Sequence, residues 1–219
     1  MFMSVCAFSI MDLIVKWTDS YPLGQVIFFR GFFGVLLYFL IMPRDRIKNF
    51  YYTKRPGLHF LRCFFGLIAL LAIFTALRNL PLATVVSISF AAPIFTTILS
   101  IFLLSEKVGL FRWLAVIVGF IGIIIITEPG FTSLNIYFIY PVIFCLGMSY
   151  VAITIRQLST SEPVWLISLY FSVTITLASF FTIPYGWIMP DIKDLILLVS
   201  IGIFGGAANL WLSQSYKFG

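Results

Sequence analysis

The sequence predicts an all-α polytopic membrane protein. Of its 219 residues, 61% are hydrophobic and only 10% are charged, whereas ordinary soluble domains carry about 25% charged residues. The apolar residues form long runs that proline, glycine and charged residues separate. Because a membrane-spanning helix with a short connector takes up roughly 27 residues, the length allows about eight spans. This composition argues against a soluble enzyme, a disordered tail and a nucleic-acid-binding domain.

The apolar runs are too long and too uniform for the strands of an outer-membrane barrel. A barrel strand has about ten residues of alternating polarity, whereas the run 82–104 contains no charged residue. A helix also satisfies its own backbone hydrogen bonds inside hydrocarbon. We therefore expect eight transmembrane helices, at about residues 1–15, 23–42, 58–77, 82–104, 110–127, 135–155, 164–183 and 195–216.

The connectors explain where these segments end, because they gather residues that either break a helix or avoid hydrocarbon. A polar stretch, 16–22, follows the first segment, and a basic stretch, 43–57, follows the second. The later connectors are Arg78-Asn79-Leu80-Pro81, Ser105-Glu106-Lys107 and Glu128-Pro129-Gly130.

Lysine and arginine in the connectors predict the orientation, because cytoplasmic loops carry an excess of these residues. With the N-terminus in the cytoplasm, three of them, Lys16, Arg78 and Lys193, lie outside. The cytoplasmic side then holds Arg44, Arg46, Lys48, Lys54, Arg55, Arg62, Lys107, Arg112, Arg156 and Lys217. We expect a bacterial inner-membrane protein with a cytoplasmic N-terminus. Contact with anionic headgroups explains the basic loop better than nucleic acid does.

Weak self-similarity at a spacing near 140 residues predicts an internal repeat. The spacings are 139, 140 and 141 residues for the pairs Arg78 and Lys217, Lys16 and Arg156, and Pro22 and Pro163. Five segments separate equivalent points, and because five is odd, the second copy has the opposite orientation, as in inverted-repeat transporters. Chance matching of apolar helices is the alternative. We expect one repeat over 1–130 and an incomplete second repeat over 131–219.

The repeat and the chain ends predict that the sequence is a fragment of a ten-span protein. The run before Lys16 is shorter than the hydrocarbon core requires. Counterparts of the segments 82–104 and 110–127 would follow Gly219.

Several short motifs, in order and at their spacing, resemble the EamA branch of the drug/metabolite transporter superfamily. They are Lys16, Phe28-Phe29-Arg30, the turn Ala76-Leu77-Arg78-Asn79-Leu80-Pro81, Ala92-Pro93, Glu106 and Gly119-Phe120-Ile121-Gly122. Within the family, Phe28-Phe29-Arg30 and the stretches 55–62 and 87–93 are similar to the S-adenosylmethionine uptake carriers. The resemblance implies ten spans and transport of small metabolites, with both importers and exporters among the relatives.

Motifs for catalysis, cofactors and metals are absent from the sequence. It contains no G-x-x-x-x-G-K-[ST], H-E-x-x-H or G-x-S-x-G pattern. One histidine and three dispersed cysteines do not form a recognisable metal-binding motif. We therefore expect no catalytic residue, no metal site and no cofactor.

Ionisable groups inside the apolar segments are the first candidate binding residues, because each costs about 2.5–3.5 kcal/mol at the centre of a span. Ser9 and Asp12 lie on one helical face with Lys16. An ion pair between Asp12 and Lys16 is the alternative to a cavity-facing role. Arg30 is either a structural anchor or a group that binds a substrate carboxylate.

Polar stripes on other segments complete the candidate site. Pro93 removes a backbone hydrogen bond and frees a carbonyl, so that a kink or gate is expected there. Packing between helices is the alternative for small residues, and it is favoured for Gly31, Gly34, Gly119 and Gly122. The candidate substrate-binding residues, expected to share one cavity between the repeats, are Ser9, Asp12, Arg30, Ser89, Phe90, Pro93, Ser149, Asn209 and Gln214.

The sequence thus predicts a secondary transporter that moves a small organic metabolite, such as an amino acid or S-adenosylmethionine, by alternating access. Its expected partners are that substrate and the lipid bilayer, and we expect no binding to nucleic acid. A second copy of the chain, forming a homodimer, is a further candidate partner. The alternatives are a channel or scaffold, which should show a repeated filter or charged ring, and an intramembrane enzyme, which needs convergent catalytic groups.

Overall fold

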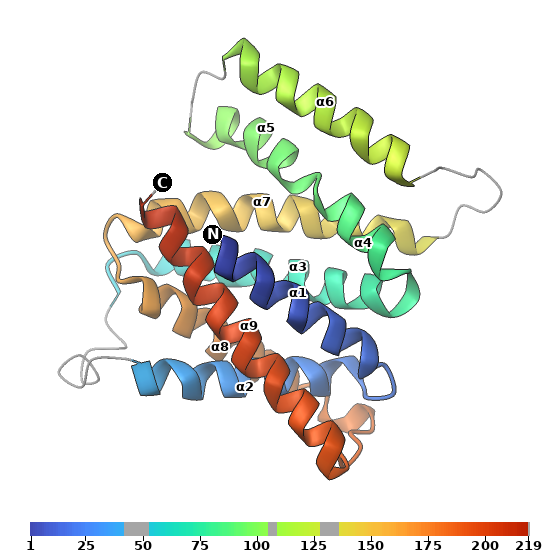
Figure 1. The fold of residues 1–219 in the computed structure, drawn as a ribbon. Coiled ribbons are helices and arrows are strands. Elements are labelled where there is room, and N and C mark those ends of the chain that lie inside the picture. Colours follow the sequence, from blue (N-terminus) through green and yellow to red (C-terminus); the bar gives the residue numbers. More distant parts are fainter. Residues whose placement is uncertain (42–52, 105–108, 128–135, 219) are drawn as a thin grey trace. The chain divides into compact units, whose positions relative to one another are not determined.

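The computed structural model describes residues 1–41, 53–104, 109–127 and 136–218, and every regular element within them is a helix (Figure 1). This confirms the all-helical expectation. Short 3-10 turns occur at Ile136–Phe138 and Ile183–Tyr185. The α-helices are α1 (Phe2–Trp17), α2 (Leu23–Ile41), α3 (Pro56–Asn79), α4 (Leu82–Ser89), α5 (Ala92–Leu104), α6 (Leu110–Thr127), α7 (Ile139–Ser159), α8 (Val164–Phe180) and α9 (Ile192–Phe218).

Within the described residues, five helical segments are long and apolar enough to cross a membrane. They are Leu23–Ile41, Pro56–Asn79, Leu82–Leu103, Ile136–Ser159 and Ile192–Tyr216, and α8 is a shorter apolar helix. The chain is therefore a polytopic membrane protein. The total of eight spans and the inverted repeat stay predictions.

The chain forms two compact units. The first unit comprises Met1–Cys63 and Thr154–Gly219, and the second comprises Phe64–Ile153. Each unit is thus made from residues of both predicted repeats, and the repeat boundary near residue 130 stays a prediction.

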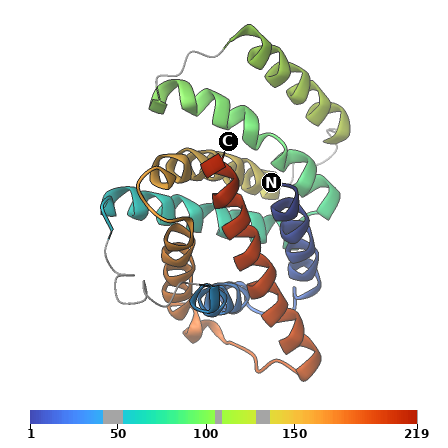
Figure 2. The same cartoon turned by 60° about the vertical axis from the view of Figure 1, so that its left-hand side comes forward.

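In the first unit, α2 packs against α8 and α9, and α1 packs against α9. Figure 1 shows α9 crossing α2, and Figure 2 shows the same helices from another side. Glycines make this approach close. A Cβ on Gly202 of α9 would lie 2.6 Å from the Phe29 carbonyl oxygen of α2, and one on Gly31 would lie 2.9 Å from the Thr176 nitrogen of α8. The packing interpretation of Gly31 is confirmed.

The other glycines that the sequence analysis assigns to packing behave differently from one another. A Cβ on Gly34 would lie 3.0 Å from Ser172 Oγ, so this glycine also lies in a tight contact. A Cβ on Gly119 would only touch Ile94 at 4.0 Å, and one on Gly122 would meet nothing within 4 Å. The close contact expected at the second pair is therefore wrong for Gly122 among the described residues.

Polar contacts join the connectors at one end of the first unit. The Gln25 side chain donates to the Ile188 carbonyl at 2.7 Å and accepts from the Ile188 N–H at 3.0 Å. Tyr21 donates to Asp194 Oδ2 at 2.7 Å. This bond raises the pKa of the Tyr21 hydroxyl, because ionisation would remove its donated proton. These bonds hold the start of α2 against the connection between α8 and α9, and the connector before α2 against the first turn of α9.

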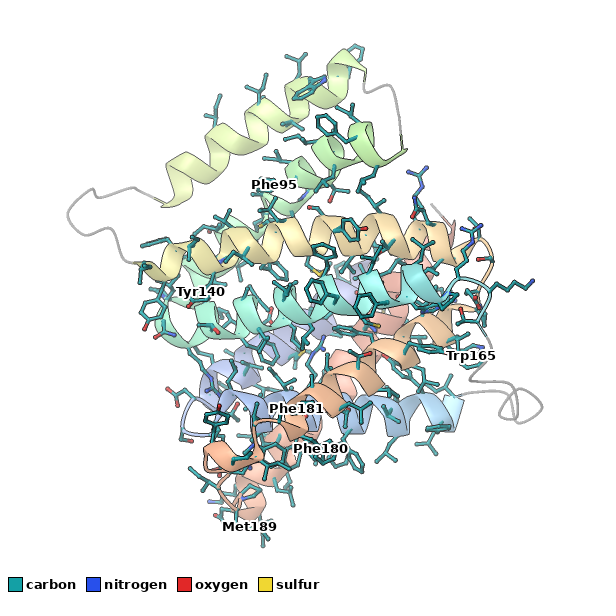
Figure 3. The ribbon with its side chains drawn as sticks, turned by 180° about the vertical axis from the view of Figure 1, so that it is seen from behind. Phe95, Tyr140, Trp165, Phe180, Phe181 and Met189 are labelled. Atoms are coloured by element: carbon teal, nitrogen blue, oxygen red, sulfur yellow. The ribbon has the colours of Figure 1, made fainter. Side chains whose placement is uncertain are left out.

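Aromatic side chains mark both ends of α8. Figure 3 shows Trp165 near one end of this helix and Phe180 and Phe181 near the other. Phe181 is 82% exposed, and Met189 in the following connection is 93% exposed. Tryptophan is enriched where a span meets the interface, and apolar exposure is expected where side chains face lipid.

We expect Gly202→Ala to lower the stability of the first unit by about 1–3 kcal/mol, because the new methyl group would meet the α2 backbone. Thermal unfolding of the purified protein in detergent measures this. Gly122→Ala is the matched control, since that site has open space. Equal unfolding midpoints for the two variants would contradict the close contact between α2 and α9.

Candidate substrate-binding site

Two arginines lie buried among the apolar helices of the first unit. Arg30 of α2 is 6% exposed and Arg62 of α3 is 1% exposed. Arg62 is the seventh residue of α3, so it lies about 9 Å along the helix from its start. Inside a membrane such groups are costly, and they commonly mark a binding site or an ion pathway.

One aromatic ring contacts both guanidinium groups. The centroid of Phe171, on α8, lies 4.0 Å from Cζ of Arg62 and 5.5 Å from Cζ of Arg30. A cation over an aromatic face is attracted by the ring quadrupole, by about 2 kcal/mol when both groups are desolvated. Phe171 therefore offsets part of the cost of burying two like charges near each other.

Hydrogen bonds tie Arg62 to α9 and α2. Its Nη2 donates to Asn209 Oδ1 at 2.9 Å, and Asn209 Nδ2 donates to Tyr38 Oη at 3.4 Å. Tyr38 in turn donates to the Gly206 carbonyl at 2.8 Å. Nε and Nη1 of Arg62 are also buried, and they have no hydrogen-bond partner among the described residues. Arg62 is thus held by one nitrogen while its other donors stay unused.

Arg30 has a different set of neighbours, on α1 and α9. Its Nε donates to Met11 Sδ at 3.4 Å. The Arg30 guanidinium also attracts the carboxylate of Asp12, the half-buried residue that follows Met11 on α1. Gly205 of α9 leaves room for the side chain, because a Cβ there would lie 3.1 Å from Arg30 Nε. Ser4 holds α1 on α9 by donating to the Ala208 carbonyl at 2.8 Å.

A histidine lies one helical turn before Arg62. His59 is 3% exposed, its ring lies 4.7 Å from that of Tyr170, and neither ring nitrogen has a hydrogen-bond partner in the described part of the chain. The nearby carboxylate of Glu162 is already engaged, since it accepts from Thr53 Oγ1 at 2.8 Å and from the Lys54 N–H at 2.7 Å. These contacts place several polar groups around the first turns of α3.

The second unit has its own polar arrangement, at the interruption between α4 and α5. Because Pro93 has no N–H, the helix breaks at Phe90 and Ala91, as the sequence predicts. Side chains of α7 contact backbone carbonyl groups near this break. Ser149 Oγ donates to the Ala92 carbonyl at 2.9 Å, and Cys145 Sγ lies 3.4 Å and 3.7 Å from the carbonyls of Ile88 and Ser89.

The nine predicted site residues are divided between the two units. In the first unit, Arg30 and Asn209 enter one cluster, and Asp12 lies beside Arg30. In the second unit, Ser89, Pro93 and Ser149 lie around the break in the helix. Ser89 also donates to its own helix, at the Val85 carbonyl. The exposed members are Ser9, Phe90, Pro93 and Gln214.

The buried cluster also contains three residues that are not among the sequence candidates, Arg62, Tyr38 and Phe171. On sequence grounds Arg62 is counted among cytoplasmic loop charges, whereas the structure buries it inside α3. Pro56 could have revealed it, because proline favours the first turn of a helix and α3 begins at Pro56. No cluster of three His, Cys, Asp or Glu suited to a metal occurs among the residues that the structure describes.

Comparisons with known proteins point to membrane transport. The profile of the EamA-like transporter family matches residues 1–128. The chain is 28% identical over 221 residues to the S-adenosylmethionine uptake transporter of Rickettsia prowazekii, covering 98% of this chain and 73% of that protein. It is 30% identical over 198 residues to the protein of the same name in Rickettsia bellii, covering 88% of this chain and 66% of that protein. It is also 25% identical over 218 residues to the pseudopaline exporter CntI of Pseudomonas aeruginosa PAO1, covering 96% of this chain and 74% of that protein.

We expect Tyr38→Phe to destabilise the first unit by about 1–2 kcal/mol, because it removes the hydroxyl that joins Asn209 to Gly206. Thermal unfolding in detergent is the measurement. Tyr185→Phe serves as control, since Tyr185 is 82% exposed. If both variants unfold at the wild-type temperature, the network around Arg62 does not contribute to stability.

Proposed function

Because the chain belongs to the EamA-like transporter family, we propose that it is a secondary transporter that carries a small organic metabolite across a bacterial inner membrane by alternating access. The observation that carries this proposal is the buried pair of arginines in an apolar helical bundle. Such groups are costly in a membrane and suit the recognition of an anionic group on a polar substrate. A gradient or an exchanged solute would supply the energy.

The substrate we propose is an amino-acid-like metabolite, and S-adenosylmethionine is the first molecule to test. Two of the relatives are named as S-adenosylmethionine uptake transporters and one as a pseudopaline exporter. S-adenosylmethionine carries a carboxylate, cationic groups and an adenine. The first unit offers arginines for the carboxylate, Asp12 for a cation, and aromatic rings such as Phe171 for a planar or cationic group.

Helix contacts within the units support the inverted repeat that alternating access would use. In the predicted repeat, α1, α2 and α3 correspond to α7, α8 and α9. The contact of α1 with α9 then corresponds to the contact of α7 with α3, where the rings of Tyr150 and Phe65 lie 4.2 Å apart. The contact of α2 with α9 corresponds to that of α8 with α3, where Tyr170 meets His59. Exchange of the repeats thus converts each of these two contacts with α9 into an observed contact with α3.

Uptake into proteoliposomes tests the function. The purified chain would be reconstituted and supplied with labelled S-adenosylmethionine, methionine and other amino acids, with protein-free liposomes as the blank. Accumulation that an unlabelled excess of the same compound abolishes would support a carrier. Flux that never saturates would instead indicate a channel, and absence of flux for the whole panel would overturn the proposed substrate class.

We expect Asp12→Asn to lower the initial rate of uptake at least about tenfold while the amount of protein inserted in the membrane stays unchanged. The reason is that Asp12 contributes a negative charge beside Arg30, worth about 1.4 kcal/mol or more if it binds a cationic part of the substrate. Asp19→Asn is the matched control, because Asp19 is exposed in the connector after α1. Normal uptake by Asp12→Asn would remove Asp12 from the proposed site. The convergence of all nine candidate residues on one cavity stays a prediction.

The proposed orientation has its own test. We expect a cysteine introduced by Lys48→Cys to react with a membrane-impermeant maleimide in inverted vesicles and not in intact cells, since the basic loop would face the cytoplasm. Cys6→Ser provides the background because Cys6 is exposed, whereas Cys63 and Cys145 are buried. Asp191→Cys, in the connection before α9, should show the opposite pattern. The reverse result at both sites would invert the topology.

A further inference from the structure

We propose that Arg62, assisted by His59, binds the carboxylate of the transported substrate. On sequence grounds Arg30 is one candidate for this role, whereas the contacts in the structure favour Arg62. The inference rests on the proposed function and names a second binding position within it. Both residues lie on α3, three positions apart, and therefore on one face of the helix.

The unused donors of Arg62 are the first observation. The side chain is 1% exposed, and Nη2 donates to Asn209 at 2.9 Å. The N–H of Nε and both N–H of Nη1 have no hydrogen-bond partner in the described ranges. A buried donor without a partner costs about 1–3 kcal/mol, and more when it belongs to a charged group. Such a group is poised for an acceptor that arrives from outside the protein.

The nearby carboxylates do not fill this place. Asp12 interacts with Arg30, and Glu162 accepts its hydrogen bonds from Thr53 and Lys54. Asn209, the side chain that does contact Arg62, is a neutral amide. In the described part of the chain, the Arg62 guanidinium therefore contacts an amide and an aromatic ring, and neither of these groups carries a negative charge.

Two consecutive aromatic residues of α8, Tyr170 and Phe171, contact the two side chains of this proposed binding position. Phe171 covers one face of the Arg62 guanidinium at 4.0 Å, and Tyr170 contacts the His59 ring at 4.7 Å. With its face on a ring, a guanidinium binds through its edge, where two parallel N–H groups match the two oxygens of a carboxylate. His59 lies three positions before Arg62 on the same face of α3, and neither of its ring nitrogens has a hydrogen-bond partner in the described ranges, so it supplies a further donor for the carboxylate.

The decisive experiment compares a substrate with its decarboxylated form. Proteoliposomes would be given S-adenosylmethionine or decarboxylated S-adenosylmethionine, with the wild type, Arg62→Gln and the control Arg55→Gln. Arg55 is exposed and precedes α3. We expect the wild type and the control to prefer the carboxylate-bearing molecule by about ten- to a hundredfold, and Arg62→Gln to lose this preference while still carrying the decarboxylated form.

Asn209→Asp is a second variant that keeps the inference testable if Arg62→Gln does not fold. It would place a permanent carboxylate 2.9 Å from Nη2 of Arg62, in the position of the amide oxygen. We expect a higher temperature of unfolding together with loss of the preference for S-adenosylmethionine over its decarboxylated form. If Arg62 were purely structural, Asn209→Asp would raise the temperature of unfolding and leave the preference for S-adenosylmethionine unchanged.

The outcomes separate the two proposals. If the wild type carries neither molecule, the proposed S-adenosylmethionine-type function fails, and the carboxylate assignment fails with it. If the wild type prefers the carboxylate and Arg62→Gln or Asn209→Asp keeps the same preference, the function stands and the role of Arg62 is overturned. An equal loss of both molecules in a well-folded Arg62→Gln protein would make Arg62 a structural anchor.

Discussion

The guanidinium of Arg62 is 1% exposed, lies against Phe171 and donates to Asn209, and a chain of hydrogen bonds runs from it through Asn209 and Tyr38. Burial removes the hydration of the charge, and within hydrocarbon no water replaces it. The protein therefore has to supply a ring face and an acceptor from two other helices, α8 and α9. Tyr38 then fixes Asn209 from α2, so that one buried charge connects four helices.

Close packing makes this arrangement possible. Gly31 and Gly202 let the backbone of α2 approach α8 and α9, because a side chain at either position would clash with a neighbouring backbone atom. Small residues allow such approaches in membranes, where apolar side chains gain little by leaving lipid for protein. Held between these helices, α2 buries Arg30 and Tyr38 two turns apart. The glycines thus determine where the polar groups lie, although they carry no polar side chain themselves.

The sequence predicts the helices well because length and uniform apolarity decide them, and even the break before Pro93 follows from its missing N–H. Arg30 and Asn209 can be identified because a charge and an amide stand out within apolar runs. Arg62 is missed because it lies between a basic loop and an apolar run, where it resembles an interfacial charge. Phe171 could not be chosen among 25 phenylalanines, since its role depends on which guanidinium groups the fold brings to its face.

The cluster also bears on how a substrate could drive the proposed cycle. Arg62 belongs to the first predicted repeat, whereas Phe171 and Asn209 belong to the second, so a movement of one repeat against the other would stretch these contacts. A hydrogen bond to a charged group contributes about 1.5–3 kcal/mol, so separation would be costly without compensation. A ligand shifts a conformational equilibrium only by its difference in affinity for the two states. A carboxylate that binds Nε and Nη1 of Arg62, and also Nη2 as that nitrogen leaves Asn209, would supply such a difference, so that substrate binding would be the step that permits the movement.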